Sequence, residues 1–255
     1  TFTVSAGAPT FAEPEAMPPP DPQEVDTETN LNAFMNIYQP YARNLSFYQP
    51  MYFLVGLDPE ESKFQLSFKY RFFNLEKGLS QKHPWVSNIF FGYTQTSFWD
   101  LASDSRPFED TSYKPELFYQ TRNIDTGLAI IKGFFLQTGF QHESNGGGGD
   151  VSRSTNYIYI EPSLIFLEEK EVAGLRIAPR FWLYVNNSDD TNPDIEDYRG
   201  YFDLGLTFGK ATSVIVDTHL RWAKEGGSAE VNLTYPLHRL FRDNLDLYFQ
   251  VQYVN

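Results

Sequence analysis

Apolar and polar side chains alternate along one stretch of the chain, Phe64-Gln65-Leu66-Ser67-Phe68-Lys69-Tyr70-Arg71-Phe72. Successive side chains of a β-strand point to opposite faces of its sheet, so a period of two places the apolar groups on one face and the polar groups on the other. The same period recurs at residues 202–208, 214–222 and 245–253. We therefore predict an all-β chain whose strands each have one apolar and one polar face.

Runs of this kind follow one another from about residue 50 onward. We count about eleven of them, over residues 51–57, 64–73, 88–99, 113–122, 128–144, 155–167, 173–186, 200–210, 213–223, 228–236 and 245–254. Most are about ten residues long, which is the length that a strand needs to cross a bilayer at a tilt of about 45°. Pro162 and Pro179 lie inside two of the runs, where a proline removes a ladder hydrogen bond.

Two kinds of antiparallel barrel fit this pattern. The apolar face points inward in a soluble barrel or sandwich, and outward to lipid in a transmembrane barrel. The polar face carries bulky charged groups such as Lys69, Arg71 and Arg180, and the apolar face is rich in Phe, Leu, Tyr and Trp. These features and the strand length favour an antiparallel transmembrane β-barrel, in which alternation conceals a lipid-facing band in a chain with only 41% hydrophobic residues.

The composition limits the chemistry and the domain organisation. A net charge of −13 disfavours nucleic acid as a partner, and the absence of Cys excludes disulfides and thiolate sites. Residues 1–30 are rich in proline and acidic groups and poor in large apolar ones. We therefore expect an N-terminal arm over residues 1–44 and a single barrel domain over residues 45–255.

Three polar side chains interrupt the apolar faces of two adjacent runs. The apolar face of residues 128–144 continues to His142 and Ser144, and the apolar face of residues 155–167 includes Asn156. Polar groups that face lipid are costly unless they are used, so we take these three as candidate functional residues.

These residue types suit nucleophilic catalysis. Side chains two apart on a strand share a face, with Cβ atoms roughly 6–7 Å apart. The imidazole of His142 can then take the hydroxyl proton of Ser144, which makes the serine a nucleophile. The side-chain oxygen of Asn156 can accept from the other ring nitrogen and orient the ring without adding charge.

A glycine-rich loop follows the serine, with the sequence NGGGGDVSR at residues 145–153. Its backbone N–H groups suit an oxyanion hole. Its carbonyls, with Asp150 and Ser152, suit a hard cation such as Ca²⁺. A flexible hairpin loop without a ligand is the alternative interpretation.

The surroundings of these residues resemble the outer membrane phospholipase A family. The resemblance rests on QHESNG at 141–146, SRSTN at 152–156, YTQTSFW at 93–99, PFEDT at 107–111 and DDTNPDI at 189–195. It implies a 12-stranded barrel in the bacterial outer membrane that hydrolyses acyl esters of phospholipids and lysophospholipids as a phospholipase A1/A2. It also implies a requirement for Ca²⁺ and activity as a homodimer. Because closed bacterial barrels have an even number of strands, we expect a last, C-terminal strand that this sequence lacks, in addition to the runs counted.

The resemblance also assigns roles by position. It implies that Ser144 is the nucleophile, His142 the base, Asn156 the orienting residue and Gly146 a donor to the oxyanion.

For the calcium site the resemblance implies the carbonyl of Gly147, the hydroxyl of Ser152 and, from the partner subunit, Ser105, with Asp150 as a weaker candidate. It implies a place in the dimer interface for Gln95, whose parity points it outward.

The chain departs from the family pattern in two places. Glycines stand at 147–149 where the family has an Arg and further polar residues, and Arg106 replaces a serine. The first change leaves a carbonyl ligand in place, and the second puts a positive charge beside the cation site. We predict a calcium-dependent outer-membrane phospholipase; the alternative function is a non-enzymatic outer-membrane pore or structural barrel.

Overall fold

The computed structural model describes residues 39–57, 61–73, 78–101, 108–148, 151–167, 173–187, 192–210, 212–239, 241 and 247–255. The chain divides into two units, residues 1–43 and 44–255, which are described separately. The described part of the first unit holds only the short helix α2, Gln39–Ala42. Most of the arm expected at residues 1–44 lies outside the described residues and stays a prediction.

The second unit consists mainly of β-strands joined by turns and short helices. The strands are β1 Leu45–Phe47, β2 Tyr52–Val55, β3 Glu61–Arg71, β4 Ile89–Asp100, β5 Phe108–Gln120, β6 Gly133–Ser144, β7 Ser154–Leu167, β8 Ala173–Tyr184, β9 Phe202–Lys210, β10 Ile215–Ala223, β11 Gly226–Pro236 and β12 Tyr248–Val254. The helical segments are α3 Leu79–Lys82, η1 Pro84–Asn88, α4 Ile195–Arg199 and η3 Leu237–Arg239. No helix of the described residues is long and apolar enough to cross a membrane.

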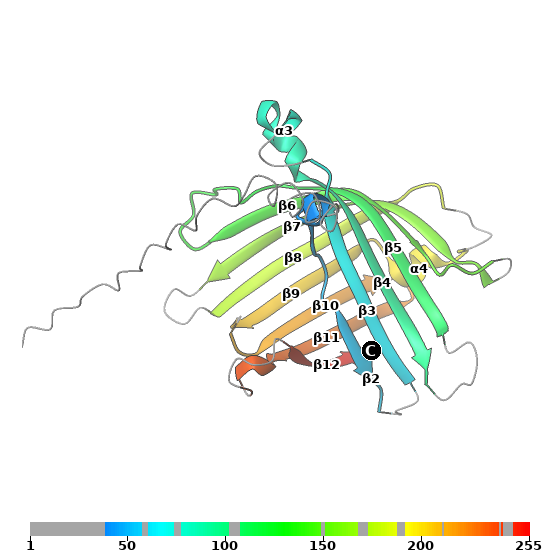
Figure 1. The fold of residues 1–255 in the computed structure, drawn as a ribbon. Coiled ribbons are helices and arrows are strands. Elements are labelled where there is room, and N and C mark those ends of the chain that lie inside the picture. Colours follow the sequence, from blue (N-terminus) through cyan, green and yellow to red (C-terminus); the bar gives the residue numbers. More distant parts are fainter. Residues whose placement is uncertain are drawn as a thin grey trace, which may run out of the picture. The chain divides into compact units, whose positions relative to one another are not determined.

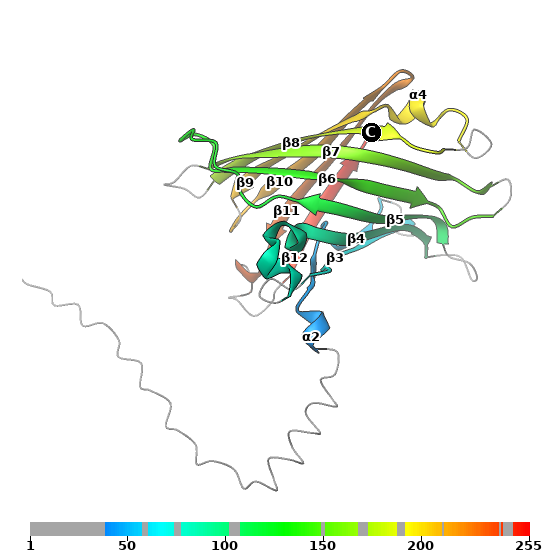
Figure 2. The same cartoon turned by 90° about the horizontal axis from the view of Figure 1, so that it is seen from above.

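The described strands form one antiparallel sheet of 12 strands, which confirms the predicted fold class. The strand that the eleven predicted runs lack is β1, which lies before the first run and not after the last one. From β3 to β12 each strand pairs with the next one along the chain, and β1 and β2 both pair with β3. Figure 1 shows the strands side by side in chain order, and Figure 2 shows the same sheet from above.

The sheet curls until its last strand lies near its first. The Tyr248 hydroxyl on β12 donates to the carbonyl of Met51, and Nζ of Lys63 on β3 lies 2.8 Å from Oε1 of Gln252 on β12. The described residues contain no ladder between β12 and β1 or β2.

The apolar face of the sheet is its exposed face. Phe68 is 37% exposed and its neighbour Ser67 only 1%, while Phe140 is 42% exposed and Gln141 only 4%. A soluble barrel with its apolar face inward would show the reverse, so that alternative is wrong. The exposed band is the surface expected where a barrel meets lipid.

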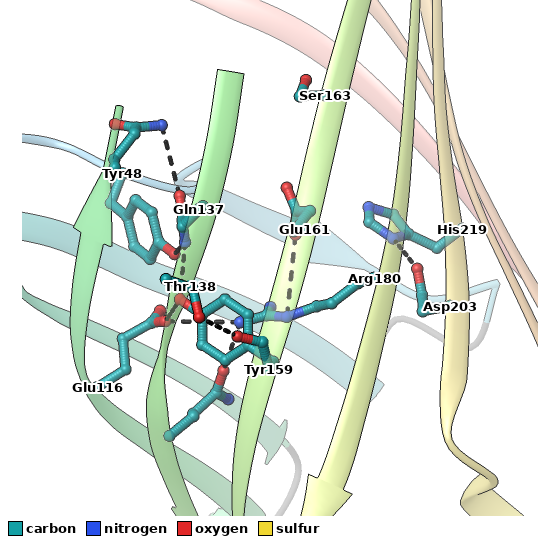
Figure 3. A network of polar contacts seen from close by, with 12 residues as sticks. Tyr48, Glu116, Gln137, Thr138, Tyr159, Glu161, Ser163, Arg180, Asp203 and His219 are labelled. Atoms are coloured by element: carbon teal, nitrogen blue, oxygen red, sulfur yellow. Dashed lines mark hydrogen bonds and ion pairs between the residues drawn. The ribbon is translucent and has the colours of Figure 1, made fainter. Parts of the chain in front are cut away.

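The interior of the curled sheet holds a polar network beside a buried aromatic cluster, which consists of Phe90, Phe118, Tyr157, Tyr159 and Trp182. Its buried polar side chains are Ser67, Thr94, Thr96, Glu116, Gln137, Gln141, Thr155, Ser163, Asp203 and Asn232. Part of this network is drawn in Figure 3: Arg180 stacks 3.7 Å from the Tyr159 ring centroid and forms ion pairs with Glu116 at 3.5 Å and Glu161 at 3.8 Å. Buried charges of this kind are tolerated only when they are paired and hydrogen-bonded. Here the guanidinium of Arg180 is paired with the carboxylates of Glu116 and Glu161.

Two strand boundaries differ from the prediction by five residues, and the other boundaries of the predicted runs lie within three residues of it. Residues 128–132 form a turn before β6, in which Ile131 N–H donates to the Leu128 carbonyl at 3.0 Å, so the strand begins at Gly133. Strand β5 begins at Phe108, five residues before the predicted start at 113, because it continues beside β4 past a register shift at Phe98/Trp99.

Two of the prolines inside strands, Pro162 on β7 and Pro179 on β8, share one gap. The β7–β8 ladder pairs Ile160 with Phe181 and Leu164 with Ile177, and the residues between these rungs, which include Pro162 and Pro179, are unpaired in this ladder. On their other sides, Pro162 pairs with Leu136 on β6 and Pro179 with Leu204 on β9. Both residues that lack a backbone donor therefore border the place where the β7–β8 ladder is interrupted.

Candidate active site

The candidate site lies at one end of the β6–β7 hairpin. In the register of this hairpin, His142 is opposite Asn156 and Ser144 is opposite Ser154. The flanking residues Gln141 and Thr155 are buried in the interior, so these four side chains share the exposed face. The three candidates that the parity of the sequence put outward are thus on one face of adjacent strands.

A hydrogen bond joins two of the three. Nδ1 of His142 lies 2.7 Å from Oδ1 of Asn156. An amide oxygen only accepts, so Nδ1 carries the proton and Nε2 of the neutral ring keeps its lone pair. The imidazole is therefore held in the tautomer that a general base requires.

Ser144 ends β6 and lies between two polar neighbours. Its register partners are Tyr113 on β5 and Ser154 on β7. It stands two residues from His142 on the same face, which is within reach of a rotated hydroxyl and imidazole. Proton transfer between these two side chains stays a prediction.

The Asn145 side chain organises the described part of the loop after Ser144. Its Oδ1 accepts from the N–H of Gly147 at 3.1 Å and of Arg153 at 3.0 Å. Its Nδ2 donates to the carbonyl of Val151 at 2.8 Å. Both arms of the loop are thereby fixed to one side chain next to the candidate nucleophile.

Gly146 has a conformation that disfavours other residues. Its φ is +67°, and a Cβ at this position would lie 2.8 Å from Cε2 of Tyr113. The ring of Tyr113 therefore covers the backbone of the residue that is predicted to stabilise the oxyanion. Sequence reasoning did not identify Tyr113, because only the register of β4, β5 and β6 brings it beside Gln95 and Ser144.

The candidate calcium ligands are only partly described. Gly147 and Ser152 lie in the loop that Asn145 holds, and both offer oxygen donors, the kind that Ca²⁺ prefers. A Cβ on Gly147 would lie 3.1 Å from the carbonyl oxygen of Val151, so this turn is too tight for a larger residue without adjustment. Ser105 and Asp150 lie outside the described residues.

Within the described ranges, no group of three or more His, Cys, Asp or Glu side chains could hold a metal ion. Gly147 and Ser152 offer a carbonyl oxygen and a hydroxyl oxygen, and oxygen ligands of this kind suit a hard cation.

Gln95 lies on the outer face of β4. Its register partners are Leu66 on β3 and Tyr113 on β5. Its amide accepts from the Tyr93 hydroxyl at 3.0 Å and donates to the Ser97 hydroxyl at 3.2 Å. Its role in a dimer interface stays a prediction.

Glu143, between the two catalytic candidates, points to the interior, where Arg199 of α4 donates to it. Burial of the guanidinium opposes its charge, but attraction and hydrogen bonding to the Glu143 carboxylate, together with contributions from Tyr157 and Tyr184, outweigh burial and raise the pKa of Arg199. Sequence reasoning missed this pair, because no local pattern connects a helix after β8 with the end of β6.

Comparison with known proteins identifies the family. The family model described as phospholipase A1 matches residues 28–255. Phospholipase A1 of Escherichia coli (strain K12) is 32% identical over 197 residues, covering 75% of this chain and 61% of that protein. Phospholipase A1 of Salmonella typhimurium is 33% identical over 197 residues with the same coverage. The chain thus spans about 61% of the length of these relatives.

Solved structures match the fold. The outer membrane phospholipase dimer of Salmonella typhi with bound calcium has a TM-score of 0.58 and 29% identity, over 75% of this chain and 69% of that one. Outer membrane phospholipase A from Escherichia coli has a TM-score of 0.55 and 29% identity, over 69% and 66%. These matches place the chain in the bacterial outer membrane as an antiparallel β-barrel protein. With the sequence match over residues 28–255, they show that the chain belongs to the phospholipase A1 family.

Proposed function

We propose that this chain is a calcium-dependent hydrolase of phospholipid and lysophospholipid acyl esters, with Ser144, His142 and Asn156 as its catalytic residues. The observation that carries the proposal is the 2.7 Å hydrogen bond between His142 and Asn156. His142 lies two residues from Ser144 on the same strand. The membership in the phospholipase A1 family supports the reaction type.

The position of the site suits a membrane substrate. The three side chains share the face that exposes Phe140 and Ile158, at 42% and 47%, so an ester of a neighbouring lipid can reach Ser144 without entering the barrel. A polar group in an apolar band is costly unless it is used, which also favours a catalytic role.

The reaction follows from the state of the imidazole. Nε2 of His142 takes the proton of the Ser144 hydroxyl as its oxygen attacks the ester carbonyl. Asn156 keeps the ring oriented through Nδ1, and the backbone N–H of Gly146 donates to the oxyanion. The imidazolium returns its proton to the departing lysolipid oxygen, and water then hydrolyses the acyl-enzyme with His142 again as base.

Residues near the oxyanion would hold the calcium ion. We assign the Gly147 carbonyl and the Ser152 hydroxyl as ligands, with Asp150 as a weaker one and Ser105 reaching the ion from a second copy of the chain. A bound Ca²⁺ supplies positive charge next to the developing oxyanion. The calcium-bound dimer of the Salmonella typhi relative supports this assignment.

A ligand from a second copy would make the homodimer the active form. Gln95 is the register partner of Tyr113, which is in turn the register partner of Ser144. An interface over Gln95 would therefore bring a second copy of the chain close to the site. Replacement of Gln95 by Ala is expected to reduce the crosslinked dimer formed in detergent with Ca²⁺, and an unchanged dimer yield would contradict this assignment.

The proposed function is tested by release of fatty acid from mixed phospholipid and detergent micelles. We expect release with Ca²⁺, none with EGTA, and a loss of about 1,000-fold or more for Ser144→Ala. Ser154→Ala is the matched control, since Ser154 is the register partner of Ser144 and lies on the same face, and we expect it to stay active. Full activity of Ser144→Ala would overturn the assignment of Ser144 as the nucleophile. Fatty-acid release that EGTA leaves unchanged would overturn the assignment of Ca²⁺ as the cofactor.

A further inference from the structure

The connection between β8 and β9 touches the strand that carries Asn156. Oδ1 of Asn187 accepts a hydrogen bond from the backbone N–H of Asn156 at 2.7 Å. The side chain of Asn192 donates to the backbone carbonyl of Ser154. The start of β7 is thus held by side chains from outside the hairpin.

A stronger contact holds β6 from the interior. The Glu143 carboxylate accepts from the Ser112 hydroxyl at 2.7 Å, lies 3.5 Å from Nζ of Lys114 and forms an ion pair with Arg199. The side chains of Glu143 and Arg199 are 15% and 21% exposed. Charge pairs with so little solvent are screened weakly, so this contact is stronger than a surface ion pair.

Helix α4, which carries Arg199, is itself fixed to the sheet. The Asp197 carboxylate accepts from Lys224 at 2.8 Å, and its carbonyl accepts from Glu225 N–H at 2.9 Å, both in the β10–β11 turn. At the other end of the helix, the Tyr184 hydroxyl donates to the Gly200 carbonyl at 2.9 Å. Arg199 therefore reaches Glu143 from an anchored support.

We propose that Glu143 and Arg199 are positioning residues for the reaction. Glu143 lies between His142 and Ser144 in the chain and points to the opposite face, so its ion pair fixes the backbone from which both catalytic side chains project. The proposal rests on the proposed function. It assigns to α4 the role of supporting the active site through Arg199, whose side chain meets Glu143 on the interior face of β6.

Positioning predicts a particular kinetic change. Neither Glu143 nor Arg199 lies on the face that meets the substrate, so loss of the pair leaves substrate binding intact and affects the chemical step. Misplacement of reacting groups by about 1 Å can cost about 100-fold in rate. We therefore expect kcat to fall while KM stays nearly constant.

The experiment compares Glu143→Gln, Arg199→Gln and the double variant in the micelle assay with Ca²⁺. Each single change is expected to lower kcat by at least about tenfold with KM within about twofold. Because the two side chains act as one unit, the double variant should lose no more than the worse single variant. Arg199→Lys, which keeps the charge, should restore part of the rate.

Glu161→Gln is the matched control. Glu161 also faces the interior, is 18% exposed, and pairs with Arg176 at 2.9 Å, on a strand that carries a catalytic candidate. We expect its kcat to stay within about twofold of the wild type. Folding of every variant is checked by heat-dependent migration in electrophoresis and by thermal unfolding.

The outcomes separate this inference from the proposed function. A wild-type chain that releases no fatty acid overturns both. A wild-type chain that is active, while folded Glu143→Gln and Arg199→Gln keep its kcat, overturns the positioning role alone. An equal loss in Glu161→Gln, or losses that multiply in the double variant, overturns it as well. If Glu143→Gln does not fold, Arg199→Gln decides, since Arg199 lies outside the strands.

Discussion

Oδ1 of Asn156 lies 2.7 Å from Nδ1 of His142, its register partner across the β6–β7 hairpin. The contact exists because the register puts both side chains on the same face at the same level. A slip by one residue would turn one of them into the interior, since side chains alternate along a strand. The geometry of the site is therefore set by strand pairing.

Replacement of Asn156 by Ala should lower kcat about tenfold or more, because the imidazole loses the acceptor that fixes its tautomer and orientation. Asn156→Asp keeps an acceptor for Nδ1 and should retain more of the rate than Ala. Both are measured as fatty-acid release at saturating micelles. Equal rates for the Ala variant and the wild type would mean that the hydrogen bond has no catalytic role.

Gly146→Ala should impair the site, and Gly148→Ala should not. The left-handed φ of +67° costs a residue with a Cβ about 1–2 kcal/mol, and the new methyl would meet the Tyr113 ring. The backbone must then move away from the oxyanion, so we expect kcat to fall about tenfold or more.

Gly148 is the matched control for that change. It lies two residues further along the same loop, and a Cβ there would have nothing within 4 Å. Similar losses for both alanine variants would show that general loop flexibility, rather than the local backbone at Gly146, controls the rate.

The parity of the sequence predicted the faces of the sheet, because alternation depends only on neighbouring residues. It placed His142 and Ser144 outward, and Gln141 is buried in the interior, as its parity requires. The choice between lipid outside and apolar core inside needed more than parity. The exposure of Phe68 and Phe140 decides it.

Contacts between distant segments could not be predicted in the same way. Arg199 reaches Glu143 across 56 residues, and its position depends on how α4 is anchored rather than on any local period. The prolines give a second example. Pro162 and Pro179 each looked unfavourable inside a strand, and only the pairing of β7 with β8 shows that they share one gap.

Ser152→Ala should raise the Ca²⁺ concentration needed for half-maximal activity by about tenfold or more, because a hard cation loses one oxygen ligand. The measurement is a Ca²⁺ titration of fatty-acid release after treatment with EGTA. Ser154→Ala, two residues along, should titrate like the wild type. A Ser152→Ala curve that overlays the wild-type curve would remove Ser152 from the ligand set.

The chain should show no steady conductance in planar bilayers. The interior is crossed by direct side-chain contacts: the Gln137 amide donates to the hydroxyls of Tyr48 at 2.7 Å and Tyr159 at 2.8 Å, both drawn in Figure 3. A lumen filled in this way leaves no aqueous path of the kind found in porins. A porin recorded under the same conditions is the positive control, and stable ohmic steps from this chain would favour the pore alternative.

Arg180→Ala should destabilise the barrel strongly. The guanidinium stacks on Tyr159, donates to Gln141 at 3.2 Å and pairs with Glu116, whose side chain is only 4% exposed. Removal of the arginine leaves that carboxylate buried without its cation, which costs about 3–5 kcal/mol. The free energy of unfolding in urea, measured in lipid vesicles, should fall by this amount.

Arg122→Ala is the control, because Arg122 is exposed and its loss should change the free energy of unfolding by about 0.5 kcal/mol or less. If the two variants unfold at the same urea concentration, the interior network does not stabilise the barrel through Arg180.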